Sequence, residues 1–296
     1  MHCVASMRVA IFWMATLFVF NALAAPGEAS DATLYGQLAD LNVRLRDERC
    51  PVRSAAVVQL YRQRTAGIHP CSEEVARGVS DDDLFRATAV AEFYSHDPAD
   101  VDVLGCLYRK LQAAGALTEW HTKTYVGALV TVARYAQANQ LAAPGMDVLP
   151  QLEFDDGVKQ QAWRMLWIQD RMHAQVKAWH PGAHHTHVVA VVHPDCHFSV
   201  RALLDIDTRP ELRWLRNNLL LVVPPDPTLS IDDIMAWNSA HPRLQMHPMY
   251  LRSDWIALNS LDTPTFYVVR DGKVLDSFDG WPNPQGLSAL RATLSR

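Results

Sequence analysis

The chain has 296 residues, 49% of them hydrophobic, and a formal net charge of −5. A net negative charge argues against nucleic acid or anionic lipid as a partner, because both require clustered Lys and Arg. The length allows two domains or one large one.

The N-terminus has the pattern of an export signal. Arg8 precedes the apolar run "VAIFWMATLFVF", and residues 22–24 form an A-x-A site. We therefore expect residues 1–24 to be a signal peptide cleaved between Ala24 and Ala25, and the protein to be periplasmic or secreted. An uncleaved anchor is the alternative, but a bilayer span needs ~20 apolar residues and this run is shorter. We expect no membrane span in the mature chain.

Residues 25–145 are predicted to form a helical domain. Ser80 precedes three acids and is a typical N-cap. Pro98 stands at a first helical position, and Gly115 stands where a helix would end. Two successive helical hairpins resemble a repeat array, although no consensus recurs at a constant period.

The segment that follows is predicted to connect two domains. The stretch "LAAPGMDVLP" places proline and glycine close together and marks the boundary. Residues 146–185 are expected to be mostly helical, although "AQVKAW" near their end also fits a strand.

Residues 186–296 alternate between strand and helix patterns. The apolar runs "HVVAVV" and "LLLVV" predict buried strands, and Ser230 with Asp233 predicts a capped helix start. Asp271-Gly272 between two strand patterns predicts a hairpin, and a helix closes the chain. Continuously apolar early strands are typical of a mainly parallel sheet covered by helices. The sequence therefore predicts an α-helical N-terminal domain and an α/β C-terminal domain with a central mixed sheet.

Five cysteines are present, and Cys3 would leave with the signal peptide. Cys50 and Cys71 flank a predicted helix, so we expect a local disulfide between them, worth ~3 kcal/mol in the chain-entropy model. Cys106 lies in an apolar helical stretch and is expected to be a buried free thiol. Cys196 is then left without an evident partner.

The surroundings of Cys196 resemble a known family. A predicted strand is followed by "CHFS", which ends in Ser199, and then by a helix, a strand and a second helix. Further along, "TPT" around Pro264 leads into a strand hairpin, and the last helix follows. This order resembles the thioredoxin superfamily over residues 186–296, and its extra strand–helix length is similar to periplasmic TlpA-type oxidoreductases. The resemblance implies a thioredoxin-like fold, Cys196 as nucleophile, Pro264 as a cis-proline facing it, and Thr263 as a substrate contact.

Elementary chemistry also favours a reactive thiol at Cys196. A cysteine immediately before a helix meets the positive end of the helix dipole and free backbone N–H groups, and both lower a thiol pKa. His193 and His197 flank it, and either would lower the pKa further as an imidazolium close to the sulfur.

Two departures from the family limit the activity. Ser199 stands where the second cysteine would be, and Ala190 stands where a buried acid is expected. A monothiol can form mixed disulfides, isomerise bridges, or act as a reductase with a second thiol, for which Cys106 is the candidate. We expect protein thiols or disulfides as partners, together with a redox partner protein. The alternative is a non-catalytic adaptor with a redox-inactive domain.

The histidines offer a rival interpretation. "WHPGAHHTH" gathers His180, His184, His185 and His187 near Cys196, and imidazole with thiolate suits copper or zinc. The spacing fits no tetrahedral motif, however, and the chain has no Gly-rich phosphate loop. We therefore expect neither a metal nor another cofactor.

Overall fold

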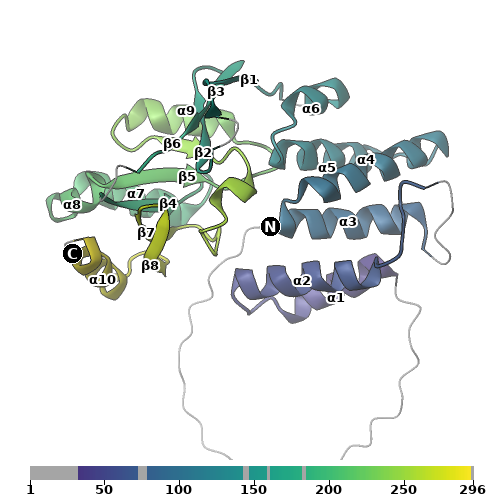
Figure 1. Ribbon diagram of the computed structural model, residues 1–296, viewed down its shortest axis with the longest axis horizontal. Helices are drawn as coiled ribbons and strands as arrows, with labels where there is room; N and C mark the ends of the chain where they lie inside the picture. The colour runs from purple at the N-terminus through teal and green to yellow at the C-terminus, as the bar shows by residue number, and fades with distance from the viewer. Residues whose placement is uncertain (1–32, 73–78, 143–146, 159–160, 182–184, 295–296) are drawn as a thin grey trace, which may run out of the picture.

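The structure is a computed structural model that places helices α1–α6 beside a region built from two β-sheets (Figure 1). The predicted signal peptide and Cys3 lie outside the residues that it describes. The described residues are 33–72, 79–142, 147–158, 161–181 and 185–294.

The helical half follows the capping signals of the sequence. The Ser80 hydroxyl accepts the Asp83 backbone N–H at 3.1 Å, Pro98 occupies the first turn of its helix, and Gly115 adopts a left-handed φ of +65°. The predicted helix starts and stop are therefore confirmed. The helices are α1 (Leu34–Arg44), α2 (Cys50–Arg64), α3 (Asp81–Ser95), α4 (Pro98–Ala113), α5 (Glu119–Thr131) and α6 (Tyr135–Leu141).

The segment that follows is not helical, and the prediction for residues 146–185 is wrong in this respect. It forms a three-stranded sheet in the order β1-β3-β2, with β1 at Gln151–Phe154, β2 at Arg164–Ile168 and β3 at His173–Ala178. Ala174 and Val176 are fully buried while their neighbours are not, which is the period of a strand. The strong helix formers of this stretch are overridden by antiparallel pairing of β2 with β3.

The second sheet has five strands in the order β6-β5-β4-β7-β8. Strands β4, β5 and β6 are parallel, whereas β7 runs antiparallel to β4 and forms the predicted hairpin with β8. The strands are β4 (Thr186–Val191), β5 (Leu219–Val223), β6 (Met246–Pro248), β7 (Thr265–Arg270) and β8 (Lys273–Asp279).

Helices cover one face of this sheet. Val188 and Ala190 of β4 pack with residues of α7, α9 and α10, whereas Val189 and Val191 face Trp255 on the opposite side. Burial of each large aliphatic or aromatic side chain contributes about 1.5–3 kcal/mol. The helices are α7 (His197–Thr208), α8 (Arg213–Arg216), α9 (Ile231–Ala240) and α10 (Pro284–Leu294), with 3₁₀ segments at Pro210–Leu212 and Arg252–Trp255.

The predicted fold class is confirmed. Helices make up the N-terminal part, and the C-terminal part has a mixed sheet with flanking helices. From β4 onward, strand, helix, strand, helix, cis-proline, hairpin and final helix follow each other in the order that the resemblance implies. The C-terminal region is thioredoxin-like.

Candidate functional site

Strand pairing brings Cys196 and Pro264 together. Val191 at the end of β4 pairs with Thr265 at the start of β7, so the residues after one strand meet those before the other. The Cys196 thiol donates to the Thr263 carbonyl oxygen at 3.3 Å, and the Thr263–Pro264 bond is cis. The structure thus assembles these three predicted residues at one edge of the sheet.

Cys196 is the N-cap residue of α7. Its carbonyl oxygen accepts the Val200 N–H at 3.0 Å, and its own N–H donates to the His193 carbonyl oxygen at 3.1 Å. The residue is half-buried and is the free cysteine of the described part of the chain. It therefore sits at the helix N-terminus with a tight turn behind it.

The surroundings of the sulfur favour the thiolate. Burial raises the pKa of the Cys196 thiol, but hydrogen bonds from the Thr263 side chain and from Ser199 and Phe198 at the start of α7 outweigh it, and the pKa is lowered. These donors stabilise a negative sulfur, whereas the Thr263 carbonyl accepts a hydrogen bond from the neutral thiol. The thiolate is the nucleophile in thiol–disulfide exchange.

Ser199 replaces a second thiol with a structural hydroxyl. The residue is completely buried, and its hydroxyl oxygen accepts the His193 backbone N–H at 3.3 Å. The Ser199 side chain and backbone also form hydrogen bonds with the Cys196 sulfur. Ser199 thus connects the nucleophile to the turn that precedes it, and it supplies no sulfur for release of a bound substrate.

The remaining predicted site residue, His197, lies apart from this network. It is exposed, and its ring packs against Phe198 with the ring centroids 5.9 Å apart. His193, which the sequence places only near the cysteine, is the buried histidine of the site.

Two further residues join the site from the loop after β5. Asp226 Oδ2 lies 3.6 Å from His193 Nε2, and the Ser230 hydroxyl donates to Asp195 Oδ2 at 3.1 Å. The prediction that Ser230 caps α9 through its side chain is wrong, because Ser230 has a left-handed φ of 41° and its side chain makes no cap hydrogen bond. Parallel strands β4 and β5 end at the same edge of the sheet, which places this loop near Cys196 but does not identify which of its residues contact the site.

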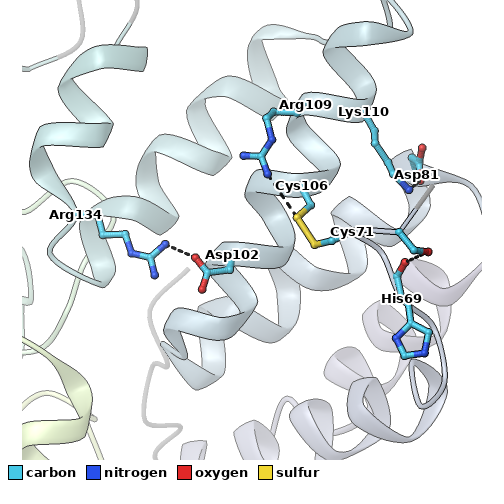
Figure 2. The surroundings of a disulfide bond; sticks show 9 residues. His69, Cys71, Asp81, Asp102, Cys106, Arg109, Lys110 and Arg134 are labelled. Atoms are coloured by element: carbon cyan, nitrogen blue, oxygen red, sulfur yellow. Dashed lines mark hydrogen bonds and ion pairs between the residues drawn. A yellow bond between two sulfur atoms is a disulfide. The ribbon is translucent and has the colours of Figure 1, made fainter. Parts of the chain in front are cut away.

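The disulfide of the helical half differs from the predicted one. Cys71 bonds to Cys106, with their Cα atoms 5.4 Å apart, so the prediction of a Cys50–Cys71 bridge is wrong (Figure 2). Packing of α4 beside the loop after α2 brings Cys106 closer than the sequence suggests. Arg109 Nη2 lies 3.6 Å from the Cys106 sulfur. Cys106 is therefore neither a free thiol nor a resolving thiol for Cys196.

The described histidines of the run "WHPGAHHTH" do not gather around Cys196. His184 lies outside the described residues, while the His187 ring packs against Trp179 with centroids 5.4 Å apart. Burial lowers the pKa of His187, and the charge of nearby His185 lowers it further. Among the described residues, no group of three or more His, Cys, Asp or Glu side chains is placed to hold a metal ion.

Within the described ranges, none of the helices has both the length and the apolar character needed to cross a membrane.

Comparison with known proteins adds little to this picture. Neither a protein-family model nor a curated protein matches the chain. Among solved structures, it is similar to a thioredoxin-like protein from Bacteroides caccae ATCC 43185, at 13% identity and a TM-score of 0.31, over 97% of this chain and 100% of that one. At that TM-score the likeness has no bearing on activity, and the fold assignment rests on the topology.

Proposed function

We propose that this chain is an exported thiol–disulfide exchange protein in which Cys196 acts as a single nucleophile. The observation that supports the proposal best is the placement of its sulfur at the N-terminus of α7, 3.3 Å from the Thr263 carbonyl and beside cis-Pro264. Hydrogen bonds that favour the thiolate have no evident use in a purely structural side chain.

The reaction follows from having one sulfur. The Cys196 thiolate attacks one sulfur of a substrate disulfide, a Cys196–substrate disulfide forms, and the other substrate sulfur leaves as a thiolate that takes a proton from water. A second thiolate, from a small-molecule thiol, a partner protein or the substrate itself, then attacks the mixed disulfide and releases Cys196. Attack by a substrate thiol on its own mixed disulfide gives isomerisation, whereas attack by an external thiol gives net reduction.

Export is part of the proposal. It is supported by the A-x-A pattern before Ala25 and by the Cys71–Cys106 disulfide, because disulfides persist mainly in oxidising compartments. Protein thiols or disulfides remain the proposed partners.

Mixed-disulfide trapping tests the proposal. Purified protein is incubated with oxidised glutathione and with a peptide disulfide, quenched with acid, and analysed by mass spectrometry. We expect an adduct on Cys196 that forms faster than on a free cysteine peptide, and none at this position in Cys196→Ser. A wild-type adduct that forms no faster than on the peptide would favour the non-catalytic adaptor instead.

A further inference from the structure

The turn that carries Cys196 contacts a loop from a distant part of the sequence. The loop after β5 carries Asp226, whose Oδ2 lies 3.6 Å from His193 Nε2. His193 is 3% exposed, so its ring is held inside the protein rather than by solvent. The contact therefore joins the ends of the two central parallel strands.

The His193 ring has a defined orientation. The Asp195 backbone N–H donates to His193 Nδ1 at 3.2 Å, an arrangement that assigns the ring proton of neutral His193 to Nε2, the nitrogen facing Asp226. The backbone of the same histidine accepts the Cys196 N–H and donates to the Ser199 hydroxyl. Fixing this ring consequently fixes the backbone that positions the nucleophile and its hydroxyl partner.

Asp226 is kept as a carboxylate. Burial raises its pKa, but interactions with His193 and with the Thr228 side chain and backbone outweigh burial and hold the pKa well below its usual range. His96 at the end of α3 interacts electrostatically with Asp226 and also with Arg252. Burial, followed by the charge of Arg252, lowers the pKa of His96 to about 4, so His96 is neutral near pH 7.

The helical half holds the loop in place. Leu229 is 6% exposed and belongs to the core formed by the helices, while Pro227 packs so closely on α5 that a Cβ at Gly127 would lie 2.9 Å from its Cβ. Leu229 and Ser230 both have left-handed φ angles, 61° and 41°, which cost free energy for residues other than glycine. Such a backbone persists only where its surroundings impose it.

We propose that Asp226 is a positioning residue that sets the reactivity of Cys196 through His193, and that the helical half keeps it there. This inference rests on the proposed function, since it concerns the same thiol. Asp226 follows the end of β5, whereas Cys196 follows the end of β4. In β4 itself, Ala190 stands where the resemblance predicts a buried acid.

The test is the pH profile of Cys196 alkylation by iodoacetamide in full-length protein, read at Cys196 by mass spectrometry. We expect Asp226→Asn to lower the rate about threefold or more at pH values below the thiol pKa, because a looser turn misaligns the groups that stabilise the thiolate. Asp233→Asn removes the same charge from the exposed start of α9 and should leave the profile unchanged.

A double-mutant cycle separates positioning from simple charge. His193→Asn keeps an acceptor near Nδ1 but is too short to reach Asp226, so combined with Asp226→Asn it should be no slower than the slower single variant. An unchanged or faster Asp226→Asn would overturn the inference, since loss of a merely repelling charge speeds alkylation. If the Asp226→Asn variant does not fold, the alkylation profile of the His193→Asn variant provides the test. An unchanged profile in that variant would refute the proposal that His193 sets the reactivity of Cys196. A wild-type thiol with an ordinary pKa would instead sink the proposed function.

Discussion

The two halves of the molecule use the same residue types in opposite ways. In the helical half, Cys106 lies within α4 and is closed into a disulfide with Cys71. In the C-terminal half, Cys196 stands at the start of α7, where backbone N–H groups of Phe198 and Ser199 hydrogen-bond the sulfur, which is a free thiol. A sulfur in a helix interior can serve stability, whereas one at a helix N-terminus is activated by the same backbone.

Two acids, one in each half, show the same contrast. Glu92 of α3 is 5% exposed and accepts a hydrogen bond from the Thr131 hydroxyl, and burial raises its pKa to about 7. Asp226 is also largely enclosed, but an imidazole, a hydroxyl and a backbone N–H face it and lower its pKa. The number of donors that face a carboxylate, rather than burial alone, decides whether it is charged. The helical half thus holds the disulfide and the protonatable acid, whereas the C-terminal half holds the thiol for which we propose reactivity.

The largest expected effect separates the two sulfur environments. Replacing both Cys71 and Cys106 by serine opens a loop of 35 residues and should cost about 3–4 kcal/mol of unfolding free energy. Chemical denaturation measures this loss, with Cys196→Ser as the matched control that should leave the midpoint unchanged. Alkylation of Cys196 in the folded double variant should keep its wild-type pH profile. A double variant as stable as the wild type would show that this disulfide does not stabilise the fold.

A somewhat smaller effect is expected at Glu92. Folding raises its pKa from about 4.5 to about 7, so the native state binds the proton more tightly than the unfolded chain does. This contribution is fully present below about pH 4.5 and is lost as the pH rises toward 7, a loss of about 3 kcal/mol in all.

The variant Glu92→Gln keeps an acceptor for Thr131 without the titration. It should therefore be more stable than the wild type at pH 8 and nearly equal to it at pH 4, as measured by urea unfolding at the two pH values. An equal difference at both pH values would show that Glu92 ionises normally, and would remove the contrast with Asp226.

The sequence could place those site residues whose position follows from the pattern of neighbouring residues. Cys196 and Pro264 could be placed because each follows or precedes an apolar run that folds as a strand, and the resemblance connects the two. Asp226 could not, because its contact with His193 depends on β4 and β5 being parallel neighbours and on the helical half holding the loop.

The errors have equally specific causes. The Cys71–Cys106 bridge depends on which helices pack together, and helical spacing does not encode that. In β2 and β3, hairpin pairing overrides residues that favour helix, so propensity was the wrong guide for 146–185.

If the fold activates Cys196, the pKa of this thiol must lie below that of an unperturbed cysteine. Alkylation by iodoacetamide across a range of pH, resolved at Cys196 by mass spectrometry in the native protein, gives that pKa. We expect an inflection below the pKa of roughly 8.5 that an unperturbed thiol has. An inflection at or above that value would show that the fold does not activate Cys196, and would favour the non-catalytic adaptor.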